Sequence, residues 1–324
     1  MGRRLLLLAA MAPLFGCSAS LRHGVTTTDA ARGLEQITRS SANEFDPAVS
    51  PDGKAIAYES ADSPTSTPHV EVVSLSDLTS GHAPRVEYSS KDATGMAPAW
   101  TPDGQAVVFE SDALGPSRLV ETIGNGIQTT RFLGRVGQDD LYSAWPALSS
   151  GGRLAFSLGP TRLFRTGWRT TLPLDATIGV TDIAGSTMSI IGAGTDPAWS
   201  PDGSRIAFAR WTGGHMHLFV SNADGSSTAQ ITDGSEDDRQ PSWSPDGRGI
   251  AFCSMHPNDA GWMQANLFVV HPDGSGLVQL TEGDRLACRP DWASDGFIYF
   301  HANATDGFHI WRIRPALEPM GARQ

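Results

Sequence analysis

Pairs of short apolar runs, joined by a tight polar turn, recur along most of the chain. In the clearest pair, residues 196–199 and 206–208 are the two runs, and Ser-Pro-Asp-Gly at 200–203 joins them. Pro201 presets φ at the second turn position, and Gly203 accepts a positive φ. Both runs have the length of a strand and neither has helical periodicity, so the pattern predicts a β-hairpin.

The same hairpin occurs six times. Five copies are clear, while the copy at 146–156 has lost the Pro-Asp of its turn. A unit that repeats about every 50 residues and consists of short strands is typical of a β-propeller. The copies begin at Pro47, Pro98, Pro146, Pro197, Pro241 and Pro290, so successive copies start 44 to 51 residues apart.

We therefore expect an all-β fold, a six-bladed β-propeller with four-stranded blades that spans residues 34–315 and is followed by a tail at 316–324. The last copy contains only three strands. The Gln-Ile-Thr at 36–38 matches Gln-Ile-Thr at 230–232 and Gln-Leu-Thr at 279–281, which lie in predicted fourth strands. Residues 34–38 are thus predicted to complete the last blade, close the ring and cover an open edge.

In four copies a tryptophan stands two residues after the first proline. A position that follows the repeat is better explained by packing between blades than by an aromatic ligand box, so we expect wedges between blades. These residues are Trp100, Trp199, Trp243 and Trp292.

The repeat resembles the PD40 repeat of TolB-like six-bladed propellers over roughly residues 34–315. TolB-like propellers bind a peptidoglycan-associated lipoprotein of the outer membrane, so the resemblance implies a binding role in the cell envelope. The residues before 34 are too few for the α/β domain that TolB carries at its N-terminus. The resemblance therefore does not carry over the identity of the partner.

Residues 1–16 have the features of a targeting segment. Arg3 and Arg4 precede an apolar stretch at 5–14 that is too short to span a bilayer. Leu-Phe-Gly-Cys at 14–17 resembles a bacterial lipoprotein signal, which implies cleavage before Cys17 and its acylation. Ser18 then implies an outer-membrane location on the periplasmic face, with residues 17–33 as a tether. An ordinary secretory peptide with a chance cysteine is the alternative.

Composition narrows the choice of partners. The chain has 35 acidic and 24 basic residues, which disfavours nucleic acid as a partner, because nucleic-acid affinity depends on Lys and Arg at phosphates. The excess of acid fits a soluble surface and a monomer. Cys253 and Cys288 would lie in an oxidising compartment, either as a disulfide or as two buried free thiols.

The loops that enter each blade, and those that join its second and third strands, share one face and vary in length and sequence. Because binding residues concentrate on variable loops of a rigid scaffold, we expect a protein or peptide partner there. The recurrence of Asp46 and Asp196 at one repeat position also fits a structural role. The expected partner-binding residues are Glu44, Asp46, Asp140, Trp168, Asp196, Trp211, His215, Arg239, His256, Trp262, Arg289 and His301.

Motifs for catalysis are missing from the sequence. It has no G-x-S-x-G, no H-E-x-x-H and no P-loop, so we expect no catalytic activity and no cofactor. The alternative is a propeller lyase or hydrolase that acts on carbohydrate with histidines and carboxylates at the channel. A metal at His215, His217, His256 or His301, or Ca²⁺ at 236–238, stays open, although neither set has a known ligand spacing.

Overall fold

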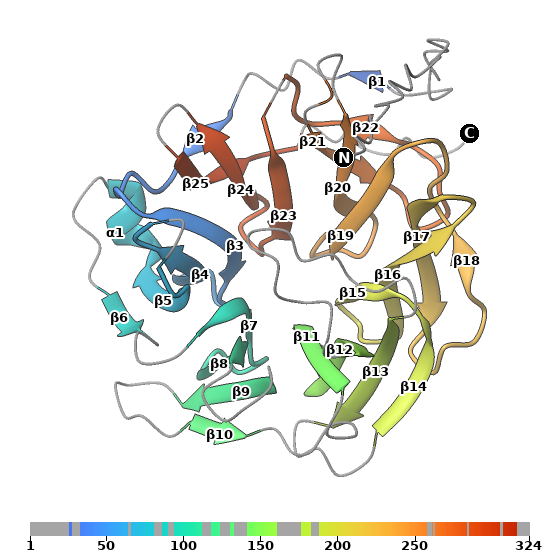
Figure 1. Ribbon diagram of the computed structural model, residues 1–324, viewed down its shortest axis with the longest axis horizontal. Helices are drawn as coiled ribbons and strands as arrows, with labels where there is room; N and C mark the ends of the chain where they lie inside the picture. Colours follow the sequence, from blue (N-terminus) through green and yellow to red (C-terminus); the bar gives the residue numbers. More distant parts are fainter. Residues whose placement is uncertain are drawn as a thin grey trace, which may run out of the picture.

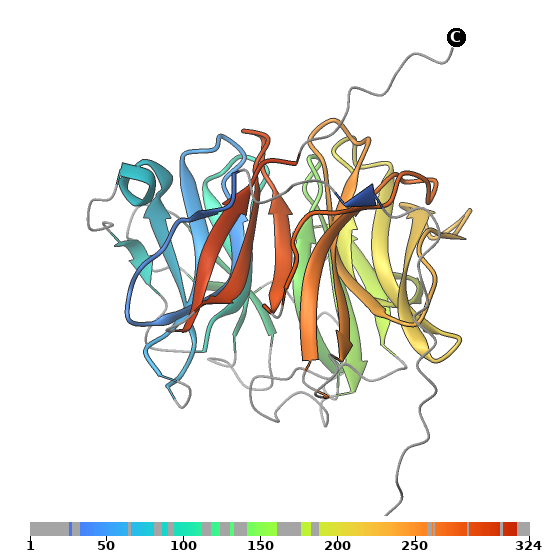
Figure 2. The same ribbon diagram turned by 90° about the horizontal axis from the view of Figure 1, so that it is seen from above.

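The computed structural model describes residues 26–27, 33–63, 66–80, 86–89, 94–111, 118–123, 130–132, 141–160, 176–182, 188–257, 261, 263–283, 285–304 and 307–315. Within these residues the strands form six sheets that stand around a central axis (Figures 1 and 2). Five sheets have four strands, and the sixth has five. The prediction of an all-β propeller with antiparallel four-stranded blades is confirmed.

Each blade begins at the axis and proceeds outward in chain order. The first three blades follow this rule without exception, and α1 (Leu75–Ser80) lies between two strands of the first. Their strands are β3 (Asn43–Val49), β4 (Ala55–Ala61), β5 (His69–Ser74) and β6 (Val86–Ser89); β7 (Met96–Trp100), β8 (Ala106–Ser111), β9 (Arg118–Ile123) and β10 (Thr130–Phe132); and β11 (Leu141–Leu148), β12 (Arg153–Pro160), β13 (Thr177–Asp182) and β14 (Met188–Ala193).

The fourth blade has the same order, whereas the fifth and sixth blades each recruit a strand from the start of the chain. In the fifth blade, β1 (Thr26–Thr27) pairs in parallel with the fourth strand, so two residues of the expected tether form an added edge. The strands of these blades are β15 (Thr195–Trp199), β16 (Arg205–Thr212), β17 (His215–Asn222) and β18 (Ala229–Gln230); β19 (Asp237–Trp243), β20 (Ile250–Pro257), β21 (Met263–Val270) and β22 (Val278–Gln279); and β23 (Ala287–Trp292), β24 (Ile298–Ala304), β25 (Gly307–Ile313) and β2 (Glu35–Gln36).

The outermost strand of the sixth blade is β2, which pairs antiparallel with β25. Beyond it, Thr38 Oγ1 accepts the backbone N–H of Ile310 at 2.9 Å. In the fourth blade, Thr232 Oγ1 accepts the N–H of Leu218 at the same distance. The matching Gln-Ile-Thr segments thus make the same contact, although one joins residues 272 positions apart and the other residues 14 apart.

The core lies between the blades. In the second strand of the fourth blade, the large buried residues Ile206 and Phe208 alternate with Ala207, and an alanine takes the same place in β4, β12 and β20, so that large side chains of one blade meet small ones of the next. The repeated tryptophans fill the same interfaces. The indole N–H groups of Trp100, Trp199 and Trp243 donate to the carbonyl oxygens of Ala48, Ala147 and Ala198 of the preceding blade at 2.9, 3.1 and 3.1 Å.

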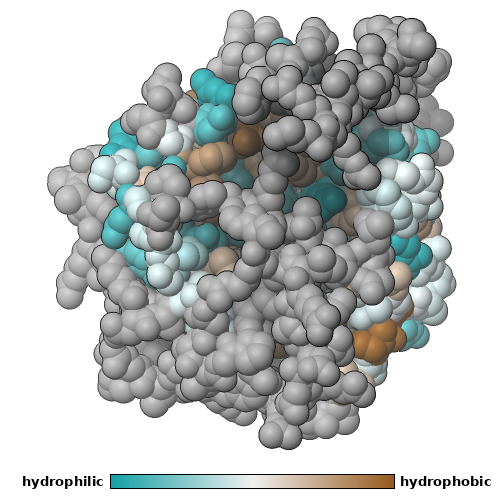
Figure 3. All heavy atoms as spheres, in the orientation of Figure 1, coloured by the Kyte–Doolittle hydropathy of each residue, from teal (hydrophilic) through white to brown (hydrophobic). Residues whose placement is uncertain are grey.

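Few large apolar side chains reach the described surface. The coloured part of Figure 3 is mostly hydrophilic or intermediate, and the exposed large hydrophobic residues among those described are Met188, Ile190 and Trp211. In the described ranges, no helix combines the length and the apolar character needed to span a bilayer.

Candidate functional site: the channel mouth

The residue before the first proline of each copy has a left-handed backbone. Non-glycine residues seldom adopt a positive φ, and a following proline further disfavours helical backbone angles, so this conformation must be held by its surroundings. The six residues, which we call the bulge ring, are Asp46, Ala97, Trp145, Asp196, Gln240 and Arg289, with φ between 49° and 58°.

Every residue of the bulge ring lies in a β-bulge of the innermost strand. The pairing between the first and second strands shifts register there, for example between Phe45 and Ala48 and between Thr195 and Ala198. A bulge redirects the side chain that it contains. Bulge-ring side chains from different blades accordingly meet one another.

Arg289 connects the bulge ring across the axis. Its Nε lies 3.6 Å from Asp46 Oδ1, and its Nη1 lies 3.1 Å from Asp196 Oδ1. Its guanidinium also stacks over the indole of Trp145, 4.9 Å from the ring centroid. One side chain of the sixth blade thereby contacts the first, third and fourth blades. We call Asp46, Trp145, Asp196 and Arg289 the mouth array.

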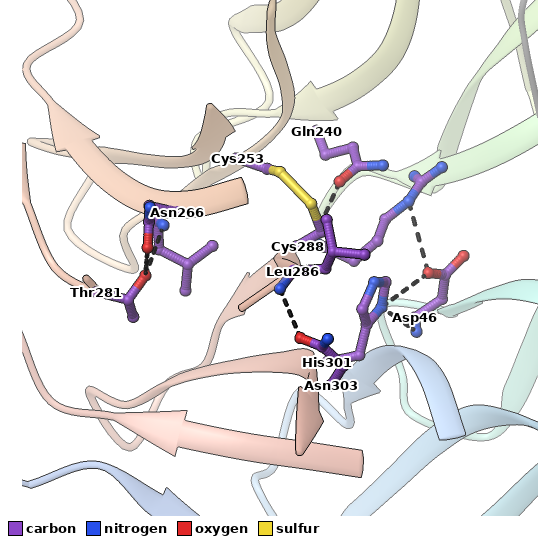
Figure 4. Close-up of a disulfide and its surroundings, with 11 residues drawn as sticks. Asp46, Gln240, Cys253, Asn266, Thr281, Leu286, Cys288, His301 and Asn303 are labelled. Atoms are coloured by element: carbon purple, nitrogen blue, oxygen red, sulfur yellow. Dashed lines mark hydrogen bonds and ion pairs between the residues drawn. A yellow bond between two sulfur atoms is a disulfide. The ribbon is translucent and has the colours of Figure 1, made fainter. Parts of the chain in front are cut away.

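Three of the left-handed residues are capped by a side chain of the preceding blade. Asp46 N–H donates to Nδ1 of His301 at 3.2 Å (Figure 4), and Asp196 N–H donates to Ser157 Oγ at 3.0 Å. The N–H of Ala97 bonds to the carboxylate of Glu59. All three caps occupy one repeat position, the residue after the aromatic of the second strand. This capping position explains why the strained backbone persists.

His301 lies against Asp46 at the axis. Its Nδ1 accepts the N–H of Asp46 at 3.2 Å and lies 3.4 Å from Asp46 Oδ1. The ring therefore supports both the backbone and the carboxylate of Asp46 in the mouth array.

The surroundings of the array shift the pKa values of its carboxyl groups and of nearby Glu59 in different directions. Burial pushes the pKa of Asp46 upward, but the Arg289 guanidinium and His301 together pull it down more strongly, so the pKa falls below its ordinary value. Burial raises the pKa of Asp196, although Arg289 and Arg239 oppose the rise. Burial, followed by the charges of Asp46 and Glu110, raises the pKa of Glu59 well above its ordinary value.

A second group lies on the rim formed by the fourth and fifth blades. Asp237 Oδ1 lies 3.6 Å from His215 Nδ1, and Asp237 Oδ2 lies 3.7 Å from Arg239 Nη2. Trp211 is 40% exposed on the strand paired with that of His215. His215 and Arg239, both expected to bind a partner, are therefore placed on either side of Asp237, while Trp211 lies opposite Met216 on the adjoining strand.

Two expected site residues have other surroundings. Glu44 is buried, and its carboxylate accepts the hydroxyls of Thr38 and Ser40 and contacts His309 Nδ1 at 3.0 Å. It lies between the first and sixth blades rather than on the rim, which corrects its place. His256 is paired through Nε2 with Gln264 at 2.8 Å. The expectations for Cys17, Asp140, Trp168 and Trp262 lie outside the described residues.

Sequence reasoning missed Trp145, Gln240 and Glu59. The first two share the position before the first proline with Asp46, Asp196 and Arg289, so alignment of the repeats on that proline would have found them. Glu59 shares the capping position with His301 and Ser157. Residues that share one repeat position lie in a ring around the axis, because each blade places that position at the same depth.

The proposed histidine ligands do not form a donor set in the described ranges, where no group of three or more His, Cys, Asp or Glu side chains is arranged to hold a metal. The rings of His215 and His217 are 6.4 Å apart. At Asp46, the place of a cation is taken by Arg289.

The two remaining cysteines are bonded to each other. Cys253 of β20 and Cys288 of β23 are joined at 2.18 Å between sulfurs, and Figure 4 shows the bond near Gln240 and His301. The bond connects the fifth and sixth blades next to the bulge ring.

Comparison with known proteins supports the fold. The model of the TolB beta propeller domain matches residues 174–318, and no curated protein matches the sequence. Among solved structures, a putative TolB from Agrobacterium tumefaciens is 20% identical with a TM-score of 0.59, over 87% of this chain and 97% of that one. TolB from Acinetobacter baumannii is 21% identical with a TM-score of 0.60, over 79% of this chain and 59% of that one.

Enzymes share the same architecture. An oligogalacturonate lyase from Vibrio parahaemolyticus is 14% identical with a TM-score of 0.56, over 87% of this chain and 94% of that one.

This chain spans about three fifths of the length of the Acinetobacter TolB. At these sequence identities, the likeness to solved structures establishes a TolB-like propeller fold, and function has to be argued from the residues at the channel mouth.

Proposed function

We propose that this chain is a non-catalytic, TolB-like propeller of the cell envelope that binds a protein or peptide partner at the mouth of its channel. The observation that carries the proposal is the mouth array, in which Arg289 joins Asp46 to Asp196 across the axis. These charges are held by strained backbone and by each other, so the array is rigid; Asp196 is buried, whereas the side chains of Asp46 and Arg289 are partly exposed at 18% and 17%. Preorganised groups of this kind bind with little loss of conformational entropy.

The charge of the mouth indicates the chemistry of the partner. Among the described residues, the ion pairs around the axis and rim join Asp46, Asp196 and Asp237 to two arginines, Arg239 and Arg289, and the chain as a whole has a net charge of −11. Complementary charge favours association and suppresses wrong partners. A partner segment with lysine or arginine side chains and an apolar residue for Trp211 fits this surface.

The proposal is tested by capture from an envelope extract with the purified propeller. Asp237→Asn on the rim is expected to reduce capture, and higher salt is expected to reduce it further, because exposed charges are screened. Asp224→Asn is the matched control. It also removes one negative charge, but from a turn on the opposite face. Equal capture by both variants and by the native protein would contradict binding at the mouth.

We also propose that the chain is lipid-anchored through Cys17 at the outer membrane, with the propeller in the periplasm. Support comes from the pattern of residues 1–17. Two or more acyl chains hold a protein stably on a membrane, because each buried methylene contributes about 0.8 kcal/mol.

A carbohydrate-acting lyase or hydrolase is a second candidate. The pKa of Asp46 is lowered and that of Glu59 is raised, and oppositely shifted carboxyl groups near a channel are a feature of acid–base pairs. Incubation with oligogalacturonate, followed by ultraviolet absorbance of the unsaturated product, tests lyase activity. Turnover that Asp46→Asn abolishes would favour the enzyme over the binding propeller.

A further inference from the structure

The disulfide occupies two defined positions of the repeat. Cys253 stands at the capping position of the fifth blade, directly after Phe252, and Cys288 directly precedes the bulge-ring residue Arg289. At the junction of the third and fourth blades the same two positions hold Ser157 and Thr195. The repeat therefore provides its own comparison for what the disulfide does.

At the junction of the third and fourth blades, the pair is joined by hydrogen bonds. Ser157 Oγ lies 3.2 Å from Thr195 Oγ1 and accepts the N–H of Asp196 at 3.0 Å. The pair thus holds the residue before the bulge and caps the bulge residue itself. At the junction of the fifth and sixth blades, a covalent bond of 2.18 Å between Cys253 and Cys288 replaces the first of these contacts.

The second contact is also replaced. The N–H of Arg289 donates to Oε1 of Gln240, the bulge-ring residue of the fifth blade, at 3.1 Å. The backbone of Arg289, with φ of 56°, is thereby held at two points: by the disulfide on the preceding residue and by the Gln240 side-chain amide on the Arg289 nitrogen. Backbone strain of this kind persists only where the surroundings fix it.

Fixing this backbone matters because the side chain of Arg289 reaches across the axis. A change of backbone at residue 289 would redirect the whole side chain and separate the guanidinium from Asp46 and Asp196. We infer that the Cys253–Cys288 disulfide is a positioning element, which holds Arg289 in the left-handed conformation that places its guanidinium in the mouth array. The importance of the array for binding rests on the proposed function, but the positioning does not.

The competing explanation is a staple that acts only on stability. A disulfide that closes a loop of 35 residues restricts the unfolded chain wherever it stands. The test must therefore follow Arg289 itself at a temperature where every variant is folded.

Two double variants separate these explanations. C253S/C288T transplants the pair found at the junction of the third and fourth blades, and C253A/C288V is its match in size without hydroxyls. Both lack the covalent bond, so both lose the same loop restriction. The readout is the NMR signal of the Arg289 side-chain Nε–H and its exchange with solvent, assigned by its disappearance in Arg289→Lys. Melting temperatures are measured in parallel.

In the native protein and in C253S/C288T, we expect a protected Nε–H signal. In C253A/C288V we expect exchange at least about tenfold faster, although its melting temperature equals that of C253S/C288T within a few degrees. If the Arg289 Nε–H loses its protection in both variants, the inference is also supported, because the covalent bond is then what positions Arg289 and hydrogen bonds cannot replace it. Native protection in C253A/C288V would overturn the inference and leave a staple. Failure of partner capture by the native protein would contradict only the proposed function, because the Arg289 signal needs no partner.

Discussion

Asp291 of the sixth blade accepts the backbone N–H of Val49 of the first blade through Oδ2 at 2.7 Å. At three other junctions an indole donates to an alanine carbonyl, but Val49 stands at the tryptophan position and Asp291 at the alanine position. The junction between the last and first blades therefore depends on a carboxylate. Burial raises the pKa of this carboxyl to about 6, although the N–H of Val49 opposes the rise.

Asp291→Asn should change how the stability of the protein depends on pH. The folded pKa of about 6 exceeds the unfolded value of about 3.9. The stability that this raised pKa contributes is therefore complete below about pH 4 and is lost as pH rises toward and past 6. Asparagine still accepts the N–H of Val49 but carries no charge. We compare the free energy of unfolding of the variant with that of the native protein at each pH. Between pH 4.5 and pH 8, we expect this difference to shift in favour of the variant by on the order of 2 kcal/mol. Urea unfolding across this range measures it, and parallel stability curves for both proteins would contradict the role of Asp291.

Arg289→Gln should destabilise the propeller by about 3 kcal/mol at pH 7, because it leaves Asp46 and Asp196 without their shared partner. The pKa of Asp46 is lowered in the native fold, so its contribution to stability is present above about pH 4 and disappears as pH falls. The loss caused by the substitution should accordingly shrink toward acid pH. The control is Arg248→Gln, since the Arg248 side chain is 69% exposed, and it should change stability by less than about 0.5 kcal/mol. Equal losses of unfolding free energy in the two variants would show that Arg289 contributes no more to stability than an exposed arginine.

Trp199→Phe tests the wedges between blades. The substitution keeps an aromatic ring but removes the indole N–H that donates to Ala147, and it should cost about 1 kcal/mol, since a partly buried carbonyl loses its partner. Trp211→Phe, at an exposed tryptophan, should leave the free energy of unfolding nearly unchanged, while Trp211→Ala should weaken partner capture. Thermal unfolding and capture distinguish these roles, and a large thermal loss at Trp211 would assign it to the core.

Removal of the residues up to 38 should destabilise the whole ring. It takes away β2 and the Thr38 hydroxyl that Ile310 and Glu44 share. We expect the melting temperature to fall by about 10 °C or more, since each kcal/mol corresponds to about 2–4 °C in domains of this size class. Removal up to residue 32 is the control, because it leaves these contacts in place. A truncation at 38 that melts like this control would show that the strand adds nothing to closure.

Cys17→Ser tests the proposed lipid anchor. Without the thiol no acyl chain can be attached, so the protein should move from the membrane fraction to the soluble fraction after cell lysis and ultracentrifugation. Gln105→Ser, in a turn of the propeller, serves as a control for handling. Retention of the Cys17 variant in membranes would contradict the anchor.

The sequence by itself determined the hairpins and their number of copies, because a Ser-Pro-Asp-Gly turn is specified by the conformations of four neighbouring residues. It also identified residues 34–38 as a fourth strand, because Gln-Ile-Thr makes the same contacts wherever it pairs. It predicted Asp46, Asp196, Arg239, Arg289 and His301 as mouth residues from their shared loops.

Only the tertiary structure decided which of these residues meet. Glu44 and Asp46 are two residues apart, yet Glu44 turns inward to His309 while Asp46 joins Arg289. Cys253 and Cys288, open as thiols or disulfide in the sequence, meet next to the bulge ring. The reason is geometric: closing the ring brings together residues more than 200 positions apart, and a left-handed bulge sets the direction of each side chain. Local sequence fixes the blades, whereas the contacts across the axis depend on the completed ring.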